Sequence, residues 1–143
     1  MRLSGDAARG RFAAARIMRL ATVDEAGRPH LVPATFTVER DRVYTAVDRK
    51  PKNTRELKRL RNVQANPAVA VLADHYDDDW NRLWWVRADG AAEIVTDPRE
   101  MAGPLELLAT RYPQYRAEPP DGPLIVITVT RWTGWAASTP AGA

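Results

Sequence analysis

The sequence contains no cysteine among its 143 residues and only two histidines. Without cysteine there is no disulfide, no thiolate nucleophile and no cysteine-ligated zinc or iron–sulfur centre. The histidines, His30 and His75, lie far apart in dissimilar sequence surroundings. This scarcity disfavours a Ser-His-Asp triad and a multi-histidine metal site.

Long hydrophobic runs are also missing. No apolar run approaches the roughly 20 residues that a membrane-spanning helix needs, and residues 1–6 contain no apolar signal core. The length is typical of one domain, and 45% hydrophobic and 27% charged residues are ordinary globular usage. We therefore predict a single cytoplasmic domain, residues 1–143, that is not inserted into a membrane.

Lysine is scarce, and all three lysines lie in a short basic segment, residues 49–61. This segment holds 7 of the 21 basic residues and only 1 of the 18 acidic residues. The rest of the chain then carries 14 basic and 17 acidic residues. Its basic residues are Arg49, Lys50, Lys52, Arg55, Lys58, Arg59 and Arg61. Positive charge is thus concentrated at one place, as an anion-binding site requires.

The basic segment leads into a predicted helix. Residues 53–56 have the spacing of a capping box, with Asn53 in place of the usual Ser or Thr, and Asn66-Pro67 ends the helix. Free N–H groups at a helix start favour bound phosphate, and Lys50 and Lys52 add positive charge there. We predict a phosphate site at Lys50, Lys52 and Asn53. A solvated basic helix face is the plain alternative. A nucleic-acid contact is less favoured, because no recognition motif accompanies the segment.

Hydrophobic periodicity predicts a mainly β chain with a few helices. The predicted strands are 17–23, 30–38, 42–47, 68–73, 82–95 and 124–130, the last with a pattern that allows continuation to 135. The predicted helices are 5–16, 53–66 and 98–111, and a proline-rich loop follows the third. Six strands without a helix between each pair favour a barrel or sandwich over a parallel sheet.

Several strand residues have two open interpretations. Pro33, Thr35 and Thr37 share one face of their strand, which is either ordinary surface or a contact for a planar ring. Trp84 is expected in the core and Trp85 on the opposite face, with Gly90 marking a bulge or a close backbone approach.

Two further groups of residues also have alternative interpretations. Trp132 and Trp135 suit either core or interface packing or a planar heterocycle. The acidic run after His75 is interpreted as a solvated loop rather than a metal site, and His30 as a structural residue.

The order of these motifs resembles the pyridoxamine 5′-phosphate oxidase-like split-barrel family, especially its deazaflavin (coenzyme F420)-dependent branch. The similar stretches are residues 20–23, 27–30, 33–36, 50–52, 55–61, 66–67, 87–92 and 112–115, followed by the tryptophan-bearing final strand. Together they cover nearly the whole chain in order.

The resemblance implies a six-stranded split β-barrel of the FMN-binding type and a homodimer with the cofactor at the subunit interface. It implies that Lys50, Lys52 and the helix start at Asn53 hold the cofactor phosphate. Pro33 and Thr35 would line the ring, and Trp132 or Trp135 would close the site from the partner subunit. Arg55 and Arg59 would face the anionic tail of coenzyme F420.

The implied function is an F420-dependent oxidoreductase that transfers a hydride between the deazaflavin and a small conjugated organic substrate. An FMN-dependent enzyme of the same family and a non-catalytic F420- or flavin-binding protein are the alternatives. No catalytic acid stands out in the sequence, and neither a metal nor a nucleic acid is expected.

Overall fold

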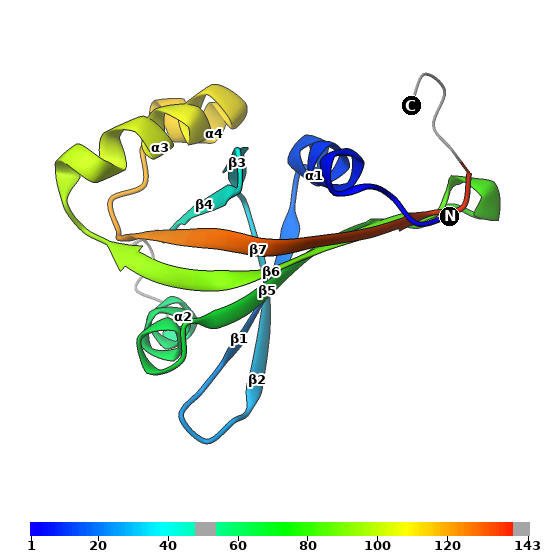
Figure 1. Cartoon of the computed structure of the whole chain (residues 1–143). Coiled ribbons are helices and arrows are strands. Elements are labelled where there is room, and N and C mark those ends of the chain that lie inside the picture. Colours follow the sequence, from blue (N-terminus) through cyan, green and yellow to red (C-terminus); the bar gives the residue numbers. More distant parts are fainter. Residues whose placement is uncertain (48–53, 139–143) are drawn as a thin grey trace.

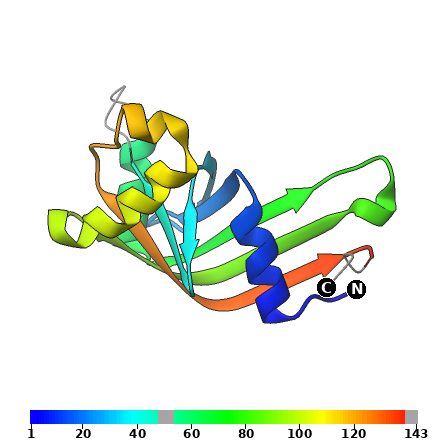
Figure 2. The same ribbon diagram turned by 90° about the horizontal axis from the view of Figure 1, so that it is seen from above.

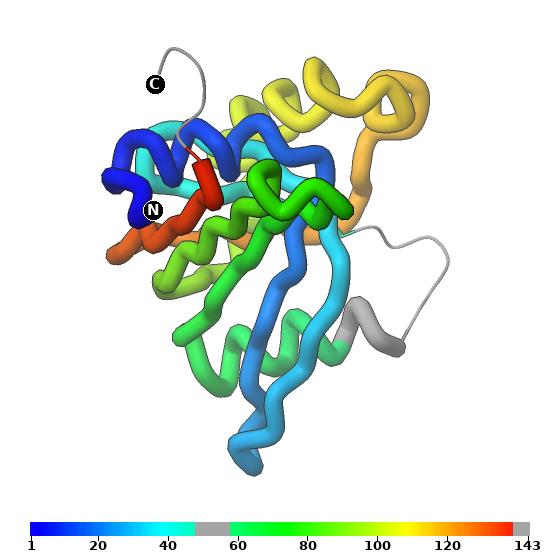
Figure 3. Tube along the Cα trace, turned by 90° about the vertical axis from the view of Figure 1, so that its right-hand side faces the viewer, coloured from blue at the N-terminus to red at the C-terminus, as the bar shows by residue number. Residues whose placement is uncertain are grey.

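The structure is a computed structural model that describes residues 1–47 and 54–138, the side chains of 54–57 excepted. The described strands form one curled antiparallel sheet in the order β2-β1-β5-β6-β7-β4-β3 (Figure 1). Their bounds are β1 (Met18–Val23), β2 (Pro29–Ala34), β3 (Thr37–Glu39), β4 (Arg42–Ala46), β5 (Ala68–His75), β6 (Trp84–Val95) and β7 (Leu124–Ala136). Figure 3 shows β2, β1 and β5 side by side at one end of this sheet.

Four α-helices are described: α1 (Gly5–Ala14), α2 (Thr54–Ala65), α3 (Pro98–Arg111) and α4 (Pro113–Ala117). A single 3-10 turn, η1 (Trp80–Arg82), joins β5 to β6. Helix α3 starts at residue 98 as predicted; the Asp97 side chain caps it by accepting from the N–H of Arg99, and Pro98 occupies the first turn. Helix α1 contacts β6 and β7, and α2 contacts β1 and β6.

The core lies inside the curl of the sheet. Phe12 of α1 and Phe36 are fully buried, with ring centroids 4.8 Å apart, and Leu20, Val86 and Ile127 are fully buried beside them. Ala34 and Phe36, which alternate with Pro33, Thr35 and Thr37 along the chain, face this core.

The predicted strand 30–38 is wrong, because the chain forms two strands there. Tyr112 explains the break: its hydroxyl accepts from the N–H of Phe36 at 3.2 Å and lies 3.0 Å from the Phe36 carbonyl. With its backbone engaged by a side chain, Phe36 leaves the strand ladder, and β2 and β3 become opposite edges of the sheet. The sheet therefore has seven strands instead of six and remains a half-barrel consistent with a split barrel.

The long β5–β6 hairpin and β7 extend together to one end of the molecule (Figure 2). The N-terminal residues join this end, since the N–H of Leu3 donates to the carbonyl of Gly134 at 2.9 Å. Helix α4 is a second correction, because a loop was predicted there; Pro113 starts a new helix after ending α3. In the described ranges, no helix is long and apolar enough to cross a bilayer.

Candidate functional site

The predicted phosphate site falls largely outside the described residues. Lys50, Lys52 and Asn53 lie there, and of Arg55 only the backbone is described, within α2. The backbone on both sides of these residues is described. The N–H of Val47, just after β4, donates to the carbonyl of Pro123 at 2.9 Å, and α2 begins at Thr54. The second part of the basic segment, residues 54–61, therefore lies within a 12-residue helix, as the sequence predicted.

Helix α2 is fixed to the sheet by a buried polar contact. Asn62, 3% exposed, donates from Nδ2 to Oγ1 of Thr22 on β1 at 3.0 Å, and Thr22 is 1% exposed. Val63 is buried next to it, and Arg61 is exposed. A buried amide without this partner would be costly, so the contact sets which side of the helix faces solvent. The sequence analysis did not single out Asn62.

The side of the sheet that faces away from the core, here called the outer face, is defined by the strand register. One row across it runs Pro33, Arg19, Leu72, Arg87 and Thr133, from β2 to β7. The next rows on either side are Leu31, Ala21, Ala70 and Asp89, and then Asp74, Trp85 and Trp135. Leu31 is 66% exposed and Trp135 38% exposed, so this face presents apolar surface to solvent.

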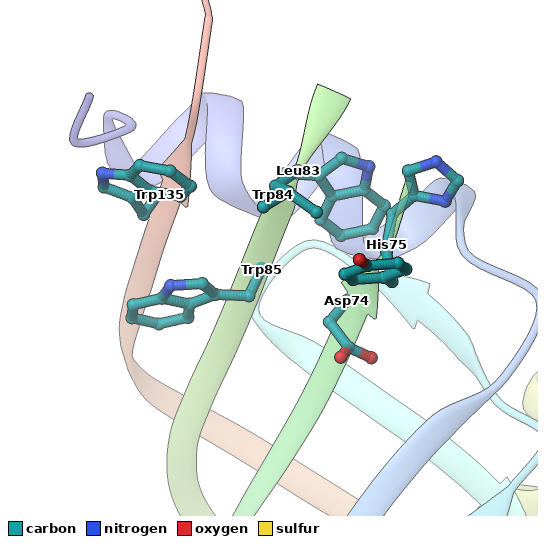
Figure 4. A pocket seen from close by; sticks show the side chains of 7 residues that line it. Asp74, His75, Leu83, Trp84, Trp85 and Trp135 are labelled. Carbon is teal, nitrogen blue, oxygen red and sulfur yellow. The ribbon is translucent and has the colours of Figure 1, made fainter. Parts of the chain in front are cut away.

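Two adjoining hollows follow these rows. The larger, about 560 Å³, is lined by Arg19, Ala21, Leu31, Ala70, Val71, Leu72, Asp74, Trp85 and Arg87. The second, about 450 Å³, is lined by Asp74, His75, Tyr76, Leu83, Trp84, Trp85 and Trp135 (Figure 4). Asp74 and Trp85 belong to both, so the hollows form one groove whose parts match the volumes of small-molecule sites.

Charges of both signs line the groove. The guanidinium of Arg19 lies 3.8 Å from the carboxylate of Asp74, and that of Arg87 lies 3.4 Å from the carboxylate of Asp89. All four side chains keep 41–52% of their surface exposed, so these pairs are solvated and leave the groups able to contact a ligand or a second protein.

The predicted ring-lining residues separate in the structure. Pro33 and Trp135 both lie on the outer face, whereas Thr35 lies between β2 and β3. Its hydroxyl is 2.7 Å from the hydroxyl of Tyr115 on α4, and its carbonyl accepts from Oγ1 of Thr45 at 2.7 Å. A hydroxyl donates once and accepts more than once, so Thr35 keeps further hydrogen-bonding capacity.

Trp135 and the end of β4 lie at opposite ends of β7. Ala46, at the end of β4, pairs with Leu124 at the start of β7, and Trp135 follows eleven residues later. That separation corresponds to about 36 Å of extended strand. In Figure 1 the start of α2 and the N-terminus, next to Trp135, accordingly lie on opposite sides of the molecule. One ligand held at both places within a single chain would have to span this length.

The tryptophan predictions have clear outcomes. Trp84 packs against the core, and Trp85 lies on the outer face, both as predicted. Trp132 packs on Phe12, with ring centroids 5.5 Å apart. Nε2 of His75 lies 3.7 Å from the Asp77 carboxylate in a loop, and within the described ranges no three His, Asp or Glu side chains gather as a metal site.

Arg19, Leu31 and Asp74 are outer-face residues that the sequence analysis missed. Asp74 lies beyond the predicted strand 68–73, because β5 continues to His75. Moreover, alternation does not distinguish a functional face from plain surface, because the neighbours across the sheet depend on register.

Comparison with solved structures supports the split-barrel architecture. An FAD-binding protein from Mesorhizobium loti is 20% identical, with a TM-score of 0.72 over 94% of this chain and 95% of that one. A conserved hypothetical protein from Mycobacterium tuberculosis is 20% identical, with a TM-score of 0.77 over 99% and 93%. The FAD binding protein from Mycobacterium smegmatis is 25% identical, with a TM-score of 0.62 over 93% of each chain.

No curated protein matches the sequence. The family model described as pyridoxamine 5′-phosphate oxidase matches residues 4–136, nearly the whole chain, in agreement with the order of motifs and the curled sheet. The chain therefore belongs to the pyridoxamine 5′-phosphate oxidase family.

Proposed function

We propose that the protein is an oxidoreductase that binds a phosphate-bearing flavin or deazaflavin and acts on a small conjugated organic substrate. The observation that carries this proposal is the basic segment, residues 49–61, at the start of α2 in a chain of this family. The cofactor would supply hydride transfer, and the protein would supply position and charge.

The basic segment supplies residue types suited to such a group. Lys50 and Lys52, together with the N–H groups of the first turn of α2, would hold the phosphate. The Asn62–Thr22 hydrogen bond keeps α2 in place for this purpose. Pro33 and Thr35 would border the ring, Thr35 with the hydrogen-bonding capacity left beside Tyr115. With no cysteine in the chain, the protein contributes no thiol chemistry of its own.

Coenzyme F420 is our first candidate for the cofactor, because the motifs resemble the deazaflavin branch and Arg55 and Arg59 are available for an anionic tail. A flavin nucleotide is the second candidate. It is favoured by the similarity to two FAD-binding proteins, one of which is 25% identical to this chain. The same two similarities are also compatible with a protein that binds a flavin and catalyses no reaction.

We also propose that two copies pair through the outer face. Exposed Leu31 provides an apolar contact, while Arg19 and Arg87 alternate with Asp74 and Asp89, so a twofold copy can place opposite charges against each other. Such pairing would also let Trp135 of one copy close the cofactor site of the other, as the family resemblance implies.

Substitution of the lysines tests the proposal. Lys52→Ala removes a charge-assisted bond to phosphate, which is worth about 1.5–3 kcal/mol, so cofactor affinity should fall about 10-fold or more. Arg99→Ala is the matched control, because Arg99 is an exposed basic residue on another helix, α3, outside the basic segment. Thermal unfolding should be unchanged in both. Equal cofactor affinity in wild type and Lys52→Ala would refute the phosphate site.

Leu31→Glu tests the pairing separately. Leu31 is 66% exposed in one chain, so the variant should fold normally, yet a charge there should produce a monomer in sedimentation equilibrium. A wild-type protein that is already a monomer, or a Leu31→Glu variant that stays dimeric, would contradict pairing through the outer face.

A further inference from the structure

Asn62 and Thr22 form a buried polar pair between helix α2 and the sheet. The 3.0 Å bond from Nδ2 of Asn62 to Oγ1 of Thr22 is directional, because a hydrogen bond weakens steeply when donor and acceptor are misaligned. The neighbours of Asn62 on the same helix, Leu60 and Val63, pack on the apolar core, and apolar burial has no preferred direction. The polar pair therefore fixes how α2 is rotated and tilted on the sheet.

The contacts that anchor α2 lie near its C-terminal end. Asn62 is in the last turn, and beyond the helix the N–H of Ala92 on β6 donates to the carbonyl of Pro67 at 2.8 Å. Thr22 lies on β1, which pairs with β2 on one side and with β5 on the other. The strand beneath Asn62 is thus itself held on both sides, whereas the start of α2 follows directly on the first part of the basic segment.

A small change at the anchored end becomes a large one at the start of α2. The 12 residues of the helix span about 18 Å at about 1.5 Å per residue. Over that length, a tilt of about 10° about the C-terminal end moves the first turn by about 3 Å. Hydrogen bonds from N–H groups to oxygen need a separation of about 2.7–3.2 Å. A displacement of that size would break the bonds between the first turn and a phosphate.

Buried polar pairs contribute orientation more readily than stability. Removal of one partner leaves the other buried and unsatisfied, which is costly, whereas replacement of both by apolar groups of similar shape costs little. The best-attested role of such groups is to fix the register of packed elements. Asn62 and Thr22 have the burial and the position for this role.

We propose that Asn62 and Thr22 are positioning residues that set the affinity for the cofactor phosphate by orienting α2, separately from what they add to the stability of the fold. The inference rests on the proposed function, which assigns the phosphate to the start of α2.

The test titrates the full chain with inorganic pyrophosphate by calorimetry, and with coenzyme F420 and FMN by fluorescence. Asn62→Ala should weaken binding of pyrophosphate and of the cofactor about tenfold, as expected for the loss of a charge-assisted bond to phosphate, and should lower the urea midpoint of unfolding. Thr22→Ser keeps the hydroxyl and should retain the affinity.

The double variant Thr22→Val with Asn62→Leu separates orientation from stability. It should regain the wild-type urea midpoint, because no buried polar group is left unsatisfied, while the affinity stays about tenfold weaker. Leu108→Val is the matched control, because Leu108 is fully buried on α3 in a separate apolar cluster. It should lower the urea midpoint and leave the affinity unchanged.

The inference is overturned if affinity recovers together with stability in the double variant, or if Leu108→Val weakens binding as much as Asn62→Ala. If cofactor binds equally to wild type and Asn62→Ala, the inference fails and the proposed function stands. If pyrophosphate binding responds as expected while neither coenzyme F420 nor FMN binds, the positioning role is supported and the proposed function fails. A wild-type chain that binds neither pyrophosphate nor a cofactor overturns both.

Discussion

Gly90 offers a sharp test of the packing of the sheet. It lies on β6 at the bulge opposite β7, where a Cβ would meet the carbonyl oxygen of Thr128 at 2.3 Å. The next atoms are also backbone, the Thr128 carbonyl carbon at 3.0 Å and Cα of Val129 at 3.1 Å. The atoms in the way belong to the backbone of β7, which cannot rotate aside as a side chain could. Gly90→Ala must therefore move β6 and β7 apart.

The expected cost follows from this geometry. The Cβ–oxygen distance must grow by about 0.7 Å to reach 3.0 Å, below which real Cβ atoms are essentially never found. Overpacking of this kind costs about 1–3 kcal/mol, and weakened ladder hydrogen bonds add about 0.5–1.5 kcal/mol each. We therefore expect Gly90→Ala to lower the free energy of unfolding by about 3 kcal/mol.

Gly103→Ala is the matched control. Gly103 lies inside α3, and no atom outside its own helix backbone lies within 4 Å of the position that a Cβ would take. Alanine there should raise stability by about 0.5–1 kcal/mol through helix propensity. Urea unfolding of both variants measures the difference. A Gly90→Ala variant within about 0.5 kcal/mol of wild type would refute the close approach of β7 to Gly90.

Three further changes test local contacts. Tyr112→Phe removes the hydroxyl that serves the buried backbone of Phe36 and should cost about 1–3 kcal/mol in urea unfolding, whereas Tyr76→Phe, 68% exposed, should cost almost nothing. Burial, and then the hydrogen bond to Glu39, raise the pKa of Tyr44 above its usual 10.0. The fold therefore favours the neutral phenol, so the free energy of unfolding should fall as pH rises above 10 in the wild type but not in Tyr44→Phe. The same slope of unfolding free energy against pH in both proteins above pH 10 would contradict this. The N–H groups of Arg28 and Ala26 hold the pKa of Asp24 below its usual 3.8. The ionised Asp24 therefore stabilises the fold above that pH, and this contribution should disappear on acidification. Asp24→Asn should remove this part of the pH dependence of stability.

Local patterns in the sequence predicted most of the fold. The helices predicted at 53–66 and 98–111 depend on neighbours in the chain, and they agree with α2 and α3 to within one residue. The split between β2 and β3 depends on the hydroxyl of Tyr112, which lies 76 residues away from Phe36 in the sequence. No local pattern contains that contact.

The candidate site was predictable only in part. Concentrated charge marks the basic segment directly in the sequence, because the residues that create it are close together in the chain. The outer-face groove instead combines Leu31, Asp74, Trp85 and Trp135 from four different strands. Their proximity depends on register and on the order of strands in the sheet, which a period of two does not determine.

The most direct test of the central claim is a fluorescence titration of the purified wild-type chain with coenzyme F420, FMN and FAD. We predict saturable binding of at least one of the three, strongest for coenzyme F420, with affinity that falls as salt is raised because the basic segment holds the phosphate. Preference for FMN or FAD would replace the deazaflavin by a flavin and keep the phosphate site. Absence of saturable binding by all three would contradict the proposed function.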